Sequence, residues 1–261
     1  MIRSLWTATS GMGAQNLNMD VIANNLANVS TTGFKKARAD FEDLLYQAIK
    51  VPGSPTSEET VSPTGIQVGL GVKTAAVQKI FSVGDLIHTG NELDVAIEGD
   101  GFFLVDMPNG NIAYTRAGNL KRDGDGRITT SDGYPLNPEI TIPENARRVA
   151  IGESGIVSAT LGDDTEATVL GNLDLATFVN DSGLLAVGRN LFRETGSSGA
   201  ASIGTPGIDG YGTLLQTYME SSNVNMAEEM ANMITTQRAF EINSKAISTS
   251  DEMMQTTVNL V

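Results

Sequence analysis

A seven-residue repeat of apolar side chains at both ends of the chain most constrains its fold. In the C-terminal segment the repeat runs through Met226, Met233, Phe240, Ile247, Met254 and Val261, and in the N-terminal segment through Leu5, Met12, Met19 and Leu26. This spacing places the apolar side chains on one face of a long helix that packs against another helix. The sequence therefore predicts a helix at each end, with these residues as candidate packing positions.

The expected N-terminal helix, residues 4–28 with Ser4 as its N-cap, has few charges. Up to Gly33 only Arg3 and Asp20 are charged, and the other polar residues are mainly Asn, Gln, Ser and Thr. Because Asn and Thr are weak helix formers, such a helix depends on burial against partners. Neighbours on several faces, including other subunits, are expected; the alternative is a coiled coil within one chain that merely closes a domain.

The C-terminal helix is predicted from about residue 225 to the end of the chain. Asn225 is placed to cap its first turn, and no glycine or proline follows. The positions beside the apolar stripe are half polar, and two of them are further candidate packing residues: Met230 and Val258. This helix is therefore expected to have several kinds of neighbour.

Between the helices the pattern changes to short strands with glycine-rich turns. Residues 94–98 alternate, and further strands are predicted near 102–105, 112–115, 147–151, 155–159, 168–178 and 184–187. The segment 108–111, Pro-Asn-Gly-Asn, is a hairpin signal leading to 112–115. The fold class is α+β: a helical domain formed by both termini, an extended linker and a central all-β domain. The expected segments are 1–33, 34–70, 71–220 and 221–261.

Composition excludes several classes of partner. The net charge of −14 argues against nucleic-acid binding and against an anionic membrane surface. No stretch approaches the ~20 apolar residues of a membrane span, so no direct membrane insertion is expected. The first residues lack an apolar signal-peptide core, which predicts export, if any, without a cleaved signal. The chain contains no cysteine and hence no disulfide.

Residues able to support catalysis are scarce. His88 is the only histidine and falls in a predicted strand. The segment 123–126 faintly resembles a calcium loop, but Arg127 and Tyr134 stand where that pattern needs oxygen ligands, which favours a hairpin turn. Gly69 and Gly71 lack the third glycine of a nucleotide site. We therefore predict no catalytic, cofactor or metal site and no enzymatic activity.

Three segments resemble the family of bacterial flagellar rod, hook and hook-associated proteins. Residues 24–35 are similar to its N-terminal signature, residues 93–103 and 114–118 to the core of its β-domain, and residues 222–224 and 237–245 to its C-terminal signature. The signature positions singled out here are Asn24, Asn25, Leu26, Ala27, Asn28, Gly33, Phe34, Gln237 and Arg238. Chain length and the segment 63–72 resemble the distal-rod group within the family.

The resemblance implies a structural subunit of the flagellar basal body that polymerises into a rigid, hollow drive shaft across the periplasm. It implies unfolded export through the flagellar type III apparatus. The expected partners are copies of itself, proximal rod subunits and hook protein at the two ends, and the surrounding outer-membrane and peptidoglycan ring proteins. It further implies that residues 46–66 contact neighbouring subunits and keep the rod straight, with Tyr46, Pro63 and Gly65 as candidate contacts.

Three alternatives remain at this point. Another flagellar axial subunit, a proximal rod or hook protein, would share the terminal pattern. A peptidoglycan hydrolase would need an acid–base pair or a nucleophile that the sequence does not display. An acidic export chaperone would need a soluble oligomer with ordered termini.

Overall fold

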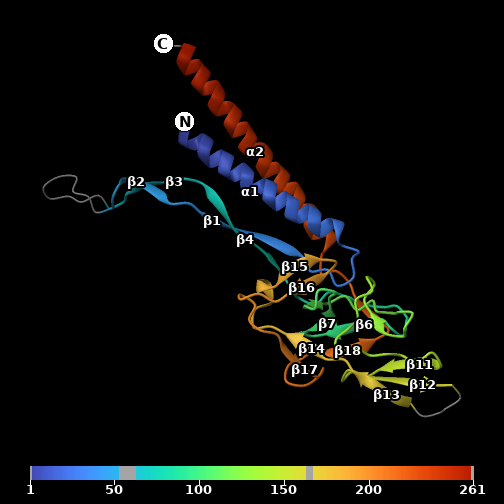
Figure 1. The fold of residues 1–261 in the computed structure, drawn as a ribbon. Helices are drawn as coiled ribbons and strands as arrows, with labels where there is room; N and C mark the ends of the chain where they lie inside the picture. Colours follow the sequence, from blue (N-terminus) through green and yellow to red (C-terminus); the bar gives the residue numbers. More distant parts are fainter. Residues whose placement is uncertain (1, 53–62, 163–166, 260–261) are drawn as a thin grey trace. The chain divides into compact units, whose positions relative to one another are not determined.

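The computed structural model describes residues 2–52, 63–162 and 167–259, which include two long helices separated by β-strands (Figure 1). The helices are α1 (Ile2–Ala27) and α2 (Met226–Asn259). The α+β class with helices at both termini is therefore confirmed. Candidate position Val261 lies outside the described residues.

The two helix starts differ in how well the sequence predicted them. α1 is already helical at Ile2, so Ser4 lies in its first turn and is not its N-cap. α2 begins at Met226 as predicted, and Asn225 Oδ1 accepts hydrogen bonds from the N–H groups of Ala227 and Glu228, at 3.0 and 3.3 Å. Asn225 thus caps α2 because its short side chain reaches the free N–H groups of the first turn.

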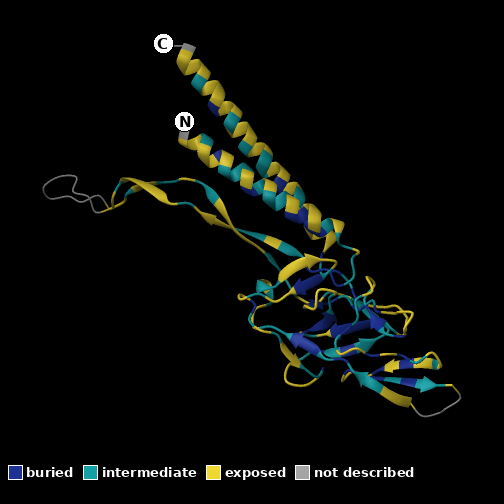
Figure 2. Ribbon diagram, in the orientation of Figure 1, coloured by how far each residue is buried: buried dark blue, intermediate teal, exposed yellow. Residues whose placement is uncertain are grey.

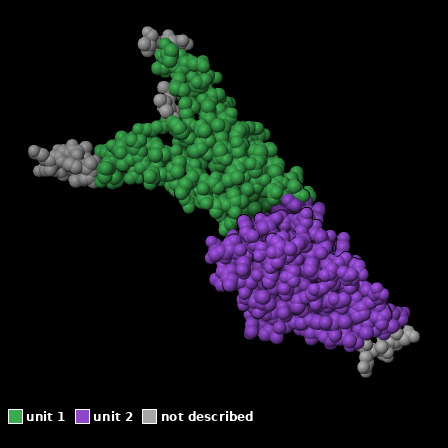
Figure 3. All heavy atoms as spheres, in the orientation of Figure 1, with its two compact units in different colours: residues 1–27, 37–78, 225–261 green, residues 28–36, 79–224 purple. Residues whose placement is uncertain are grey.

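The chain divides into two compact units (Figure 3). Unit 1 comprises residues 1–27, 37–78 and 225–261, and unit 2 comprises residues 28–36 and 79–224. These limits differ from the expected segment boundaries: the end of the N-terminal signature belongs to the β-rich unit, and most of the expected linker belongs with the helices. The reason is pairing between distant segments, which the local pattern does not display.

In unit 1, α1 and α2 run antiparallel along each other (Figure 1). The segment expected to be an extended linker contains the strands of two small ribbons. β1 pairs with β4, and β2 pairs antiparallel with β3. Their bounds are β1 Ala37–Asp43, β2 Tyr46–Lys50, β3 Ile66–Gly69 and β4 Val72–Lys79.

Unit 1 attaches its strands to α1 through polar side chains. Ser10 Oγ accepts a hydrogen bond from Val72 N at 3.3 Å. The side-chain amide of Asn25 pairs with both backbone groups of Ala37, donating to its carbonyl at 2.8 Å and accepting from its N–H at 2.9 Å. At the start of β1, the side chain of Asn25 thus makes the two hydrogen bonds that the backbone of a neighbouring strand would make.

Unit 2 is built on a six-stranded sheet in the order β15-β16-β8-β7-β14-β17. A three-stranded sheet, β11-β12-β13, and the pairs β18-β6, β19-β5 and β10-β9 complete its strands. The first strands in chain order are β5 Leu86–His88, β6 Val95–Glu98, β7 Phe102–Asp106, β8 Ile112–Thr115, β9 Lys121–Arg122 and β10 Ile128–Thr129. The remainder are β11 Ala146–Ile151, β12 Ile156–Leu161, β13 Ala167–Asn172, β14 Leu175–Thr177, β15 Leu185–Gly188, β16 Leu191–Arg193, β17 Ser202–Gly204, β18 Thr213–Gln216 and β19 Tyr218–Glu220.

The core of unit 2 lies on both faces of β7, which is buried throughout most of its length (Figure 2). Phe103 and Val105 face the larger apolar cluster, and Phe102 and Leu104 face a smaller cluster with Tyr114. Side chains alternate along a strand, so a strand buried on both faces reads as a continuous apolar run. The predicted strands in this region and the hairpin between β7 and β8 are confirmed.

Gly118 is a position where this core leaves no room for a side chain. A Cβ there would lie 1.6 Å from the carbonyl oxygen of Val95, whose N–H donates to Gly118 O at 2.9 Å. Only glycine permits this approach between the loop after β8 and the start of β6.

We predict that Gly118→Ala destabilises unit 2 by on the order of 3 kcal/mol, because the added methyl group must push two paired backbone segments apart. Urea unfolding followed by near-ultraviolet circular dichroism would measure the loss. The matched control is Gly124→Ala, where a Cβ meets no atom within 4 Å. Equal unfolding midpoints for the two variants would contradict the prediction.

Candidate functional site

The end of the N-terminal signature is buried inside unit 2. Gly33, Phe34 and Lys35 are all buried, and Gly33 N donates to Glu220 O at 2.9 Å. Gly33 has φ +68°, and a Cβ on it would lie 2.7 Å from Ala117 N. Glycine is therefore required both by the left-handed backbone and by the close approach of a second segment.

A buried carboxylate holds this segment in place. Glu220 Oε1 accepts from Lys35 Nζ at 2.5 Å, and Glu220 Oε2 accepts from Arg116 Nε at 3.0 Å. Gly84 N also donates to Glu220 Oε1, at 2.9 Å. The side chain of Glu220 is 0% exposed, so all of these bonds form in a medium from which water is excluded. We call Lys35, Arg116 and Glu220 the buried ion triad.

Both cations of the triad also bond to backbone carbonyls. Lys35 Nζ donates to Ser82 O at 2.7 Å, and Arg116 Nη1 donates to Gly99 O and Gly101 O at 2.8 and 2.7 Å. Arg116 Nη2 is buried and has no hydrogen-bond partner among the described residues. The triad thus connects the N-terminal signature, the strand that precedes the C-terminal signature and the turn between β6 and β7.

The electrostatics of the triad make Lys35 dependent on Glu220. Burial lowers the pKa of Lys35, the neighbouring Arg116 lowers this pKa further, and Glu220 opposes both effects. Burial also lowers the pKa of Lys79, whose Nζ donates to Lys35 O at 3.1 Å and lies 4.6 Å from the centre of the Phe34 ring. A carboxylate beside a buried lysine favours its charged form, which burial alone disfavours.

Asn223 of the C-terminal signature joins the same region. Its Oδ1 accepts from Lys36 N at 2.7 Å and its Nδ2 donates to Ile80 O at 2.8 Å. This amide therefore bridges the segment after Lys35 to the segment that leads into β5. It differs from Asn25 of unit 1, whose amide pairs with both backbone groups of the single residue Ala37.

The remaining signature positions lie nearer the surface. Leu26 and Asn28 are half-buried, whereas Asn24, Ala27, Gln237 and Arg238 are exposed. Asn28 Oδ1 accepts from Thr31 Oγ1 at 3.2 Å within the turn after α1. Arg238 pairs with Glu241 one turn later on α2, at 3.0 Å. Such an exposed ion pair contributes little to stability.

The predicted packing stripes fall into two groups in unit 1. The half-buried positions are Leu5, Met12, Met19, Leu26, Met233, Phe240, Ile247 and Met254. The exposed candidates are Met226, Met230 and Val258. Among the linker candidates, Tyr46 and Pro63 are exposed and Gly65 is half-buried against Lys50 and Pro52.

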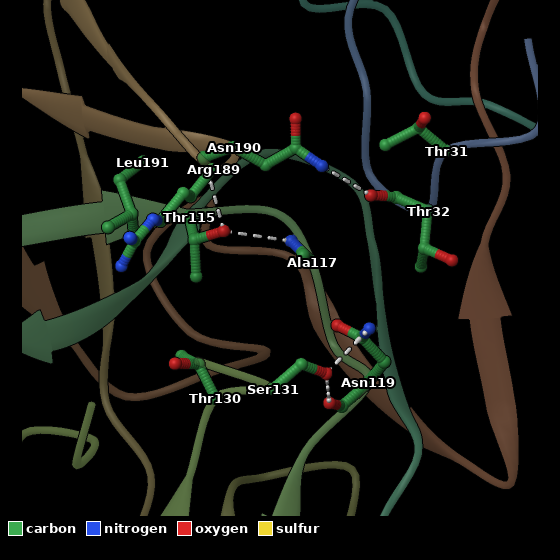
Figure 4. Close-up of a pocket in the computed structure, with 10 residues that line it drawn as sticks. All are labelled: Thr31, Thr32, Thr115, Ala117, Asn119, Thr130, Ser131, Arg189, Asn190 and Leu191. Carbon is green, nitrogen blue, oxygen red and sulfur yellow. Dashed lines mark hydrogen bonds between the residues drawn. The ribbon is translucent and has the colours of Figure 1, made fainter. Parts of the chain in front are cut away.

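A small pocket in unit 2 lies beside the signature segment (Figure 4). It has a volume of about 190 Å³ and is lined by hydroxyl and amide side chains with Arg189 at one side. Most of its polar groups already bond to one another: Thr115 Oγ1 donates to Asn190 O at 2.9 Å, and Asn190 Nδ2 donates to Thr32 O at 2.9 Å. Its polar groups chiefly connect the signature segment to β8 and to the turn before β16.

The residues considered above as catalytic or metal-binding candidates lie in a regular strand and a turn. His88 ends β5, and the segment 123–126 is the turn between β9 and β10. Among the residues described, no group of three or more His, Cys, Asp or Glu could hold a metal ion. No helix in the described ranges is long and apolar enough to cross a membrane.

Lys35, Arg116 and Glu220 were not predicted as a site from the sequence, although Lys35 and Arg116 lie in segments that resemble the family. A charged residue directly after the apolar strand that ends at Thr115 was the available signal for Arg116. Glu220 gave no comparable signal, because its partners are 185 and 104 residues away in sequence.

Three family models match the chain. A model of the flagella basal body rod protein matches residues 5–35, and one of the flagellar hook protein FlgE/F/G D1 domain matches residues 96–159. A model of the C-terminal part of the flagellar basal body rod FlgEFG protein matches residues 215–260. The three matches include the three members of the buried ion triad.

Full-length relatives carry one name. The chain is 52% identical to the flagellar basal-body rod protein FlgG of Buchnera aphidicola subsp. Schizaphis graminum, over 98% of each chain. It is 51% identical to that of Borreliella burgdorferi and 42% identical to that of Bacillus subtilis, each over 100% of this chain and 99% of the relative. The flagellar hook protein FlgE of Helicobacter mustelae matches only 51% of this chain and 30% of its own length.

We predict that Glu220→Gln destabilises unit 2 by about 3–5 kcal/mol, because it removes the only carboxylate that is bonded directly to the buried cations Lys35 and Arg116 among the described residues. Lys35→Met should cost less, since Glu220 keeps Arg116 and the N–H of Gly84. Urea unfolding followed by the near-ultraviolet dichroism of the tyrosines would measure both losses.

The control for this experiment is Glu144→Gln, which makes the same change at an exposed position of unit 2. If Glu220→Gln and Glu144→Gln unfolded at the same urea concentration, the ion triad would not hold the signature segment.

Proposed function

The chain belongs to the family of flagellar basal-body rod proteins, and we propose that it forms the distal rod, as copies that pack into a hollow shaft. It is a structural component of the flagellar basal body. The match to rod proteins over whole chains, against a partial match to a hook protein, supports the rod over the hook as its location.

The observation that carries this proposal is the set of large apolar side chains that are exposed to solvent on unit 1. Large apolar side chains on a single chain's surface mark interaction sites when they gather together. On the helices the exposed ones are Trp6, Met226, Met230, Ile234, Ile242, Met253 and Val258. α2 therefore keeps apolar side chains exposed in addition to those that face α1.

The β2–β3 ribbon supports the same proposal. A two-stranded ribbon is marginally stable in water unless another surface covers it. Its exposed apolar side chains are Tyr46, Ile49, Val51, Ile66 and Leu70. We propose that neighbouring copies cover this ribbon, with Tyr46, Pro63 and Gly65 among the contacts, and that these contacts keep the shaft straight.

The physics of assembly follows from such contacts. When one surface of a protomer binds a different surface of the next and the rotation does not close, the product is a helical filament. At about 25 cal/mol per Å² of apolar area, burying these helix faces contributes several kcal/mol per interface. The neutral amides and hydroxyls left uncovered on the terminal helices are suited to line a channel, because they hold unfolded cargo less strongly than charged or apolar walls.

Further partners follow from the proposed location. At its ends the rod would contact proximal rod subunits and hook protein, and along its length the ring proteins of the outer membrane and peptidoglycan. Its subunits would pass through the flagellar type III export apparatus. The family is a structural one, and we propose that the chain has no enzymatic activity.

We predict that Met230→Glu with Ile234→Glu abolishes polymerisation and motility while leaving both units folded. Both residues are exposed on α2, so the change places charge in a contact between copies and not in the core of the single chain. Sedimentation of the purified chain and swimming of a complemented deletion strain would measure the two effects.

Val179→Glu is the control, because Val179 is 96% exposed in a turn of unit 2. That variant should polymerise and swim like the unaltered chain. Normal motility of the double α2 variant would reject this face of α2 as a contact between copies.

A further inference from the structure

The most deeply buried line of side chains on α2 is polar. Glu229, Thr236 and Ser250 are each less than a tenth exposed, and with half-buried Asn243 they form a series spaced by seven residues. The apolar stripe of Met233, Phe240, Ile247 and Met254 runs beside this series, four residues further along at each step. A spacing that alternates between four and three is that of a coiled-coil seam, so one of the two seam positions on α2 is filled by polar residues.

Three of the four polar residues of this seam contact a matching position on α1. Asn25 Nδ2 donates to Glu229 Oε2 at 3.3 Å, and Asn18 Nδ2 donates to Thr236 Oγ1 at 3.0 Å. At the next step, a Cβ on Gly11 would lie 3.1 Å from Asn243 Nδ2, so the amide of Asn243 packs over the glycine backbone. From one contact to the next, the residue number decreases by seven on α1 and increases by seven on α2, as expected for antiparallel helices. We call them the polar ladder.

The apolar stripes cannot by themselves fix how far α1 slides along α2. Leucine, methionine, phenylalanine and isoleucine recur every seven residues on both helices, so a shift of one heptad again brings apolar side chains together. The polar ladder does not survive that shift. With Asn25 opposite Thr236, Glu229 would lose its partner on α1, and a buried carboxylate without a partner is costly.

We propose that the polar ladder, and not the apolar stripe, sets the register of α1 against α2. Buried polar groups at seam positions are known to select register at some expense in stability. Asn25 contributes twice, because its amide also pairs with the backbone of Ala37 and so ties the ladder to the start of β1. The register decides which α2 side chains stay exposed, whatever partner then covers them, so the inference goes beyond the proposed function and does not rest on it.

Disulfide trapping tests the proposal, because the chain has no cysteine of its own. Gly11→Cys with Asn243→Cys reports the observed register, and Gly11→Cys with Ser250→Cys reports a shift of one heptad. In the full-length purified chain, the first pair should oxidise about tenfold faster than the second, which corresponds to the lower end of the cost of an unsatisfied buried polar group. Equal rates for the two pairs would overturn the proposal.

The decisive comparison repeats both pairs with Glu229→Leu, which removes the buried carboxylate that a shift would leave without its partner on α1. The rate ratio should then fall to about threefold or less as the shifted register becomes accessible, with helix content by circular dichroism unchanged. Glu252→Leu makes the same chemical change at an exposed position of α2 and should leave the ratio unaltered. An unaltered ratio in the Glu229 variant would show that the polar ladder does not set the register.

Discussion

A buried carboxylate, that of Glu220, is the group on which the arrangement of unit 2 depends. It pairs with both Lys35 and Arg116 where water cannot reach them, and it accepts a backbone N–H as well. Ion pairs of this kind do not add much stability over an apolar core of the same volume, but an incomplete pair is strongly unfavourable. The triad therefore specifies one arrangement of three distant segments and penalises others.

The same logic applies to the polar groups of unit 1. The helices use an amide–carboxylate contact and an amide–hydroxyl contact where a strict coiled coil would have leucine. Such a seam gives up some apolar burial in exchange for a defined register. The apolar side chains that this leaves outside are then available to a second surface. In a subunit that assembles, a fixed register of the two helices determines which apolar side chains remain exposed for contacts with other subunits.

The sequence predicted most of the secondary structure and the general nature of the fold. Periods of seven and two are local signals, so the terminal helices, the cap at Asn225 and the hairpin after β7 could all be read from neighbouring residues. The role of Lys35 could not be predicted, because the sequence does not distinguish a buried lysine from a solvent-exposed one when its partner, Glu220, is distant. The two compact units were likewise not visible in the local pattern, because residues far apart in sequence pair within each of them.

The sequence alone determined that this chain has two long helices around a β-rich middle and that it resembles flagellar axial proteins. Only the tertiary structure decided which side chains form the buried ion triad and the polar ladder. Glu220 and Glu229 bond to partners that lie more than a hundred residues away in sequence. The physical reason is that hydrophobic periodicity depends on neighbouring residues in the sequence, whereas the burial of a charged side chain depends on the residues around it in three dimensions.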